Sequence, residues 1–334
     1  MNRLMLVPLS ICWIHVAHIA QAASPTIADD RNVAEAIARN AIIWDVRPAD
    51  AYAAGHIAGS INIGEAPRVL RDENTEDFIA TDRIEKILGA AGLDPKREII
   101  VYGSRGTWMP YFGLYTIRYF GGDNVRVYHE GIEGWTAAGH ATSREAPTTV
   151  AISLKLEISP SVAVTTNEVV ARLNDPGVQI IDARPPKEFT GEDIRAIRGG
   201  HIPGAINIPY EQNWIDPETL AKLSRKQVTS NAGMSLKSVG DLKKLYARFD
   251  PNKETIVYCQ SGARASETAG VLQELGFTKV KVYDSSWLGY GNTLDAPANN
   301  VTFFNVGLLT QRLSTLQERV NQLEKELAES KARR

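Results

Sequence analysis

One cysteine stands in a sequence context that suits sulfur or anion chemistry. Cys259 opens the segment 259–264, Cys-Gln-Ser-Gly-Ala-Arg, which follows the apolar run 256–258 and leads into a helical pattern. Unpaired backbone N–H groups and the positive end of the helix dipole therefore surround the loop. Gly262 permits backbone angles that other residues resist, and Arg264 adds a fixed positive charge. This combination favours a thiolate and predicts a nucleophilic cysteine.

The alternative for Cys259 is a structural cysteine, because cysteine is among the residue types that are most often buried. Its position at the end of a strand, where open α/β sheets bind ligands, favours catalysis instead. The glycine, the helix start and the arginine favour the same interpretation. We therefore expect Cys259 to be catalytic. We expect the residues after it to bind the substrate: Gln260, Ser261, Gly262, Ala263 and Arg264.

The segments around this loop occur twice along the chain. Four pairs recur in the same order: 41–47 and 178–184, 55–63 and 200–208, 98–102 and 254–258, and 124–128 and 279–283. Each pair contains a short β-branched run, which is typical of a strand buried on both faces. Because helical patterns lie between the runs, the sequence predicts two tandem α/β domains, each a parallel sheet flanked by helices. Gly103 occupies the position of Cys259 in the first copy, so that copy has no thiol.

An Asp-x-Arg sequence follows the same strand in both copies, as Asp182 and Arg184 in the second. These side chains could contact the substrate directly, or they could form a buried ion pair that holds neighbouring loops. We favour the second role, since paired buried charges are usually structural. Asp182 and Arg184 are thus expected to support the site.

Several motifs together resemble the rhodanese domain. They are Asp-x-Arg after a strand, Gly-His-Ile-Pro-Gly-Ala at 200–205, the cysteine of the six-residue loop, and Tyr-Asp-Ser-Ser-Trp at 283–287. The tandem copies resemble the thiosulfate/mercaptopyruvate sulfurtransferase arrangement. The resemblance implies an inactive rhodanese-like domain at 23–145 and a catalytic one at 160–300.

The resemblance also implies a ping-pong sulfurtransferase that needs no cofactor. A small-molecule donor, thiosulfate, gives its outer sulfur to Cys259, and a thiophilic acceptor such as cyanide or a thiol removes it. Arg264 is expected to pair with the sulfonate or carboxylate of the donor. Phosphatases of the related type have one more residue between cysteine and arginine, so the shorter loop argues against phosphoryl chemistry.

Two other functions remain open at this point. The loop 260–264 matches neither the basic sequence of thiosulfate-preferring relatives nor the Gly-Ser-Gly of mercaptopyruvate-preferring ones, so 3-mercaptopyruvate is an alternative donor. A persulfide carrier that delivers sulfur from Cys259 to a partner protein, without turnover, is the other alternative.

The N-terminal residues 1–22 have the pattern of a secretory signal peptide. A basic residue precedes the apolar run 4–20, and small residues allow cleavage after Ala22. We expect a periplasmic or secreted protein with no membrane association after cleavage. Cys12 leaves with the leader, so Cys259 remains as a single thiol and no internal disulfide can form.

Composition argues against two other kinds of partner. The formal net charge is −2, and no dense block of lysine and arginine offers a surface for phosphates, so we expect no nucleic acid. The six histidines are scattered and no Cys/His spacing matches a ligand set, so we expect no metal.

The C-terminal residues 303–332 have a separate hydrophobic pattern. Apolar residues recur in steps of three and four: Val306, Leu309, Leu313, Leu316, Val320, Leu323 and Leu327. This pattern predicts a coiled-coil helix that joins copies of the chain into a homo-oligomer. The alternative is a single amphipathic helix that packs on the body of the protein.

Overall fold

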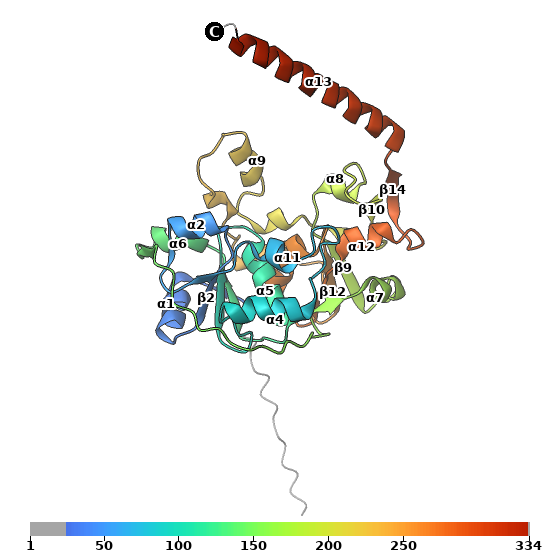
Figure 1. Cartoon of the computed structure of the whole chain (residues 1–334). Coiled ribbons are helices and arrows are strands. Elements are labelled where there is room, and N and C mark those ends of the chain that lie inside the picture. The colour runs from blue at the N-terminus through green and yellow to red at the C-terminus, as the bar shows by residue number, and fades with distance from the viewer. Residues whose placement is uncertain (1–24, 333–334) are drawn as a thin grey trace, which may run out of the picture.

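Two parallel sheets of five strands form the framework of the chain in its computed structural model, which describes residues 25–332 (Figure 1). Helices flank both sheets, and a long helix follows at the C-terminal end. The predicted α/β class, with two tandem domains and a C-terminal helix, is confirmed. The signal peptide expected at 1–22 lies outside the described residues.

The first domain places its strands in the order β1-β6-β5-β2-β4. These strands are β1 (Ile27–Ala28), β2 (Ile42–Asp45), β4 (Ile61–Asn62), β5 (Ile99–Tyr102) and β6 (Val125–Tyr128). A separate antiparallel pair joins β3 (His56–Ile57) and β7 (Thr142–Ser143). The helices of this domain are α1 (Asp30–Ala38), α2 (Ala49–Ala54), α3 (Ala66–Leu70), α4 (Thr81–Ala90), α5 (Met109–Tyr119) and α6 (Gly131–Ala137).

The second domain repeats this topology, with strand order β8-β13-β12-β9-β11. Its strands are β8 (Ala163–Val164), β9 (Val178–Asp182), β11 (Ile206–Asn207), β12 (Glu254–Tyr258) and β13 (Val280–Tyr283). β10 (Arg198–His201) pairs with β14 (Asn299–Phe303), as β3 does with β7. The helices are α7 (Thr166–Ala171), α8 (Pro186–Phe189), η1 (Tyr210–Asn213), α9 (Thr219–Ser224), η2 (Ala232–Met234), α10 (Val239–Leu245), α11 (Ala263–Glu274) and α12 (Ser286–Asn292).

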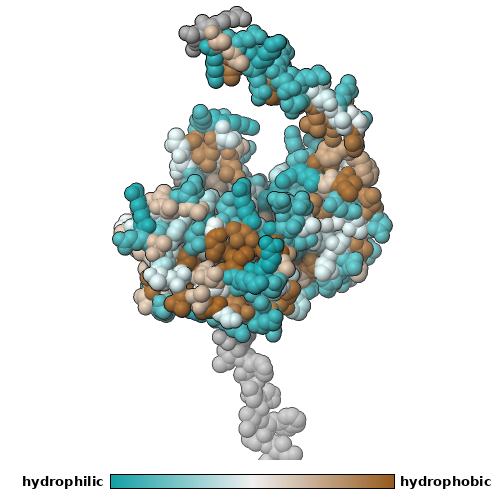
Figure 2. Space-filling model, viewed as in Figure 1, coloured by the Kyte–Doolittle hydropathy of each residue, from teal (hydrophilic) through white to brown (hydrophobic). Residues whose placement is uncertain are grey.

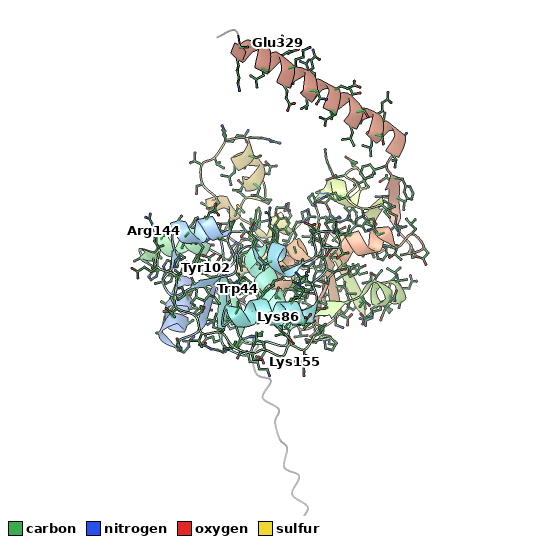
Figure 3. The ribbon with its side chains drawn as sticks, in the orientation of Figure 1. Trp44, Lys86, Tyr102, Arg144, Lys155 and Glu329 are labelled. Carbon is green, nitrogen blue, oxygen red and sulfur yellow. The ribbon has the colours of Figure 1, made fainter. Side chains whose placement is uncertain are left out.

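The central strands are buried on both faces. Every residue of β2 and of β5 is buried, and Trp44 and Tyr102 from these neighbouring strands lie inside the first domain (Figure 3). Lys155 lies at the lower edge of the body in the same view. Because helices cover both faces of a parallel sheet, the strand sequences are continuous apolar runs and do not alternate between apolar and polar residues.

The two domains meet mainly through α5 and α11. Gly270 of α11 lies against Tyr111 of α5, and a Cβ at this glycine would stand 2.6 Å from the tyrosine ring. The segment 144–162, which connects the two domains, also packs against them. Its residue Leu156 is buried, and the N–H of Ser159 donates to the carbonyl of Tyr119 over 2.8 Å.

After β14 the chain enters α13 (Val306–Ala332), in which every residue is exposed. Figure 2 shows hydrophobic residues among hydrophilic ones along this helix, which stands clear of both domains. Packing of α13 on the body of its own chain, the alternative above, is not seen. Within residues 25–332, no helix combines the length and the apolar character needed to cross a membrane.

The contact at Gly270 predicts an asymmetric response of two helical glycines. Gly270→Ala forces the Tyr111 ring to move, and it should lower the free energy of unfolding by about 1–3 kcal/mol despite the better helix propensity of alanine. Gly240 of α10 is exposed, and the nearest atom to its added Cβ is a serine oxygen at 3.8 Å. Gly240→Ala should therefore raise stability by up to about 1 kcal/mol. Thermal unfolding measures both, and equal effects would contradict the packing argument.

Candidate active site

Cys259 lies directly after β12, the central strand of the second sheet, and its side chain is fully buried. Residues at the start of α12 hold its backbone on both sides. The N–H of Cys259 donates to Oγ of Ser286 over 3.1 Å, and its carbonyl accepts from the N–H of Trp287 over 3.0 Å. The cysteine is thus fixed at the carboxyl edge of the sheet, where this class of fold binds ligands.

The loop after Cys259 presents a set of unpaired backbone donors. The first bond of α11 runs from the N–H of Ser266 to the carbonyl of Gly262. The N–H groups of residues 260–265 donate to none of the residues in 25–332, and neither these nor any other group there donates to the sulfur of Cys259. Unpaired N–H groups at a helix start form an anion-binding nest. Their free donors suit an anion bonded to the sulfur.

Only glycine fits at position 262, because of its backbone conformation and because of a close neighbour. Its φ is +80°, in the left-handed region that favours glycine. A Cβ at this residue would also stand 2.7 Å from the carbonyl oxygen of Asp284. Any side chain here would displace the loop and turn its N–H groups.

Arg264, in the first turn of α11, pairs with a carboxylate of the second domain. Its two terminal nitrogens contact the two carboxylate oxygens of Glu188, at 2.8 and 3.0 Å. Burial alone raises the pKa of Glu188, but the hydrogen bonds and charge of Arg264 hold that pKa below its ordinary value. The guanidinium is thus paired with a carboxylate of its own chain, and its pairing with the sulfonate of a donor stays a prediction.

A cavity of about 640 Å³ opens beside the loop, between the two domains. Four of the five residues expected to bind substrate line it: Gln260, Ser261, Ala263 and Arg264. Arg195 also lines it, and its carbonyl accepts a hydrogen bond from the Gln260 side chain at 2.5 Å. The first domain supplies the other wall: Pro67, Arg68, Arg71, Asp72, Glu73, Glu76 and Trp108.

Asp182 and Arg184 form a fully buried ion pair and do not line this cavity. The closest contact joins Nη2 of Arg184 to Oδ2 of Asp182 at 2.6 Å, and Nη2 also donates to the carbonyl of Gly200 at 2.8 Å. Arg47 and Asp45 of the first domain make the same contact at 2.6 Å. The pair is therefore identical in the copy without a thiol, and in each copy the arginine also donates to the carbonyl of a following loop, at Gly55 and at Gly200.

The corresponding loop of the first domain is covered by the second domain. A Cβ at Gly106, which occupies the position of Gly262, would stand 2.2 Å from the Cβ of Met234 in η2. The Met234 carbonyl lies 2.8 Å from Nε2 of His129. The first copy therefore has neither a thiol nor an open loop.

Three residues at the site were missed by the sequence analysis: Glu188, Arg195 and Arg71. From Asp182 to His201 is 19 residues, against 11 from Asp45 to His56 in the first copy, and this extra length was the visible signal for Arg195. Glu188 lies just before the extra residues 189–199, and no motif marks it. Arg71 lies in the first domain, 190 residues before Ser261, and nothing in its local sequence marks it. No group of three metal-ligating side chains gathers anywhere in the part of the chain that the structure describes.

A family model described as the rhodanese-like domain matches residues 30–138 and 165–293. The chain is 32% identical over 262 residues to a putative thiosulfate sulfurtransferase of Saccharopolyspora erythraea, covering 75% of this chain and 86% of that protein. It is 32% identical over 258 residues to the thiosulfate sulfurtransferase of Corynebacterium glutamicum, covering 74% and 80%.

Among solved structures, the anaerobic ergothioneine biosynthesis enzyme of Chlorobium limicola matches with a TM-score of 0.69 and 22% identity, over 82% of this chain and 69% of that one. A structure titled as an EanB variant with ergothioneine linked to a persulfide cysteine matches with a TM-score of 0.68 and 20% identity, over the same shares of each chain. At these identities the likeness concerns the fold.

The Glu188–Arg264 pair predicts a pH-dependent effect of Glu188→Gln. The variant leaves a buried guanidinium without a charged partner and should lose about 3 kcal/mol of stability at neutral pH. Because the pKa of Glu188 is lowered on folding, its contribution is complete above the ordinary pKa of 4.5 and is lost as the pH falls through the lower folded value. Denaturant unfolding across this range should show the two proteins converging.

The matched control is Glu35→Gln, which removes an exposed pair with Arg31 at 2.9 Å. It should change stability by less than about 1 kcal/mol. A Glu188→Gln deficit that stays constant on acidification would contradict the assigned pair.

Proposed function

The chain belongs to the rhodanese family as a tandem pair of rhodanese-like domains, and from this premise we propose that it is a sulfurtransferase acting through a persulfide on Cys259. One observation carries the proposal. Within residues 25–332, the N–H groups of residues 260–265, in the loop that begins at Cys259, have no hydrogen-bond partner. A persulfide is an anion whose terminal sulfur lies one bond beyond the cysteine, where such donors can reach it.

The proposed first half-reaction transfers one sulfur atom. The Cys259 thiolate attacks the outer sulfur of thiosulfate, a new S–S bond forms, and the S–S bond of the donor breaks to release sulfite with the electron pair. A thiophilic acceptor, cyanide or a thiol, then attacks the terminal sulfur and regenerates the thiolate. In each step one bond to the transferred sulfur forms as another breaks, with the electron pair leaving on sulfite or on the thiolate, so no external oxidant or reductant is needed.

Thiosulfate is the proposed donor because the cavity has cationic side chains on both walls. Arg68 and Arg195 line the cavity from opposite domains and also pair with carboxylates, Glu65 at 3.1 Å and Glu188 at 3.4 Å. Their side chains are 83% and 48% exposed, against 14% for Arg264, so they are the more accessible cations for an incoming anion. Relatives that share about a third of the sequence are named for thiosulfate. The same cations would also receive the carboxylate of 3-mercaptopyruvate, which stays the alternative donor.

Thiocyanate formation from thiosulfate and cyanide tests the enzyme, with 3-mercaptopyruvate assayed alongside. Cys259→Ser should lose activity by at least about a thousandfold, since the hydroxyl cannot carry sulfur. Intact-mass spectrometry of the wild type after thiosulfate should show the addition of one sulfur atom, located on Cys259.

The outcomes separate the candidate functions. Sulfur uptake without thiocyanate turnover would favour a persulfide carrier over an enzyme. Turnover with 3-mercaptopyruvate but not with thiosulfate would identify 3-mercaptopyruvate as the donor. A Cys259→Ser variant with full activity would overturn the Cys259 persulfide, on which the thiosulfate enzyme, the 3-mercaptopyruvate enzyme and the carrier all depend.

We also propose that α13 joins copies of this chain into a homo-oligomer. Its seam leucines are solvent-exposed, Leu313 at 66% and Leu316 at 63%, so burial between copies would remove apolar area from water. The seam repeats as in a coiled coil.

Light scattering of the full chain tests this assembly. Leu316→Asp together with Leu323→Asp places charges in the seam and should reduce the mass to that of one chain. Gln322→Asp, outside the seam on the same helix, should leave the mass of the assembly unchanged. A monomeric wild type, or an unchanged mass in the seam variant, would contradict the proposal.

Export with cleavage after Ala22 and a periplasmic or secreted location complete the proposal. They rest on the leader pattern of residues 1–22. Mass spectrometry of the protein recovered outside the cytoplasm would identify the mature N-terminus.

A further inference from the structure

Arg71 of the first domain reaches across the domain boundary to the loop that begins at Cys259. Its Nη1 donates to the carbonyl of Ser261 over 2.5 Å, and its Nη2 pairs with the carboxylate of Asp284. Both partners belong to the second domain. The Arg71 side chain is only 5% exposed, so these contacts are made in a setting with little water.

The first domain holds this guanidinium rigidly. The ring centroids of Phe78 and Phe112 lie 4.9 and 4.7 Å from its central carbon, and the carbonyl of Glu76 accepts a further hydrogen bond. All three residues belong to the same domain as Arg71. A planar group with several fixed donors is therefore presented to the other domain in one orientation.

The contact with Ser261 fixes the direction of a peptide group in the loop. In a trans peptide the carbonyl of Ser261 and the N–H of Gly262 point in opposite directions. Because Arg71 draws the carbonyl toward the first domain, the N–H of Gly262 is turned away from it. Glycine at φ +80° offers little steric resistance to a flip of this peptide, so an external contact is needed to keep one orientation.

We propose that Arg71 is a positioning residue for sulfur transfer, which keeps the Ser261–Gly262 peptide oriented so that its N–H serves the persulfide and its carbonyl stays away from it. The inference rests on the proposed function. It gives the domain without a thiol a defined part in the reaction. A flipped peptide would present a partial negative charge to an anionic sulfur and would remove one donor from the nest.

The alternative role for Arg71 is to join the two domains without affecting the loop. The two roles differ in what they change. A joining residue affects stability, whereas a positioning residue affects kcat and the lifetime of the persulfide at equal stability.

The test compares Asp284→Asn with the double variant Arg71→Met, Asp284→Asn. The asparagine keeps Asp284 from becoming a buried unpaired charge when the arginine is removed. The difference between the two proteins therefore reports Arg71. We expect the double variant to lose about 100-fold in kcat for thiosulfate, the low end of the loss for one transition-state donor. It should also release its persulfide sulfur faster, with KM little changed.

Arg68→Met is the matched control, since Arg68 lies on α3 and lines the same cavity without contacting the loop. If the effect came from lost positive charge in the cavity, Arg68→Met would reproduce it. Instead it should raise KM and leave kcat near that of the wild type.

Arg71→Lys keeps the charge but lacks the planar fork, and it should show a partial loss of kcat with a thermal midpoint near that of the wild type. It decides the question if the double variant does not fold. Wild-type kcat and persulfide lifetime in a folded Arg71 variant would overturn the inference while leaving the proposed function intact. A wild type that takes up no sulfur would instead overturn the proposed function.

Discussion

The hydrogen-bonding capacity of one short stretch of backbone governs the rest of this structure. A strand that ends in Cys259 turns through Gly262 into a helix, and this turn leaves the N–H groups of residues 260–265 without partners in the described chain. Buried or half-buried donors without acceptors cost free energy, and an anion inside the loop offsets that cost. The central position of β12, the left-handed glycine and the anchoring by α12 all serve to hold this arrangement.

The duplication has given the two copies different roles at one boundary. Each copy extends a segment over the loop of the other: Arg71 of the first domain contacts the loop at Ser261, and Met234 of the second covers the loop at Gly106. The first-domain loop at Gly106 is covered by Met234, and it lacks a thiol. The other retains a cavity between the domains. The first copy thereby forms one wall of the cavity and contacts the loop of the second.

Local sequence was sufficient for the features that depend on neighbouring residues. The recurring β-branched runs identified the core strands, and Cys259 with Gly262 identified the loop, because a strand, a glycine and a helix start are all encoded within a few positions. The partner of Arg264 was not predictable, since Glu188 approaches it only after the chain has folded. Arg71 is an even longer-range case, as its role depends on how α5 and α11 dock the two domains. The homo-oligomer remains a prediction, because it requires a second chain.

The most direct test of this account is a crystal structure of the protein after reaction with thiosulfate. The account predicts that the terminal sulfur of the Cys259 persulfide lies inside the loop, within hydrogen-bonding distance of several nitrogens of residues 260–265. A persulfide whose terminal sulfur points into the cavity and contacts none of these nitrogens would contradict it.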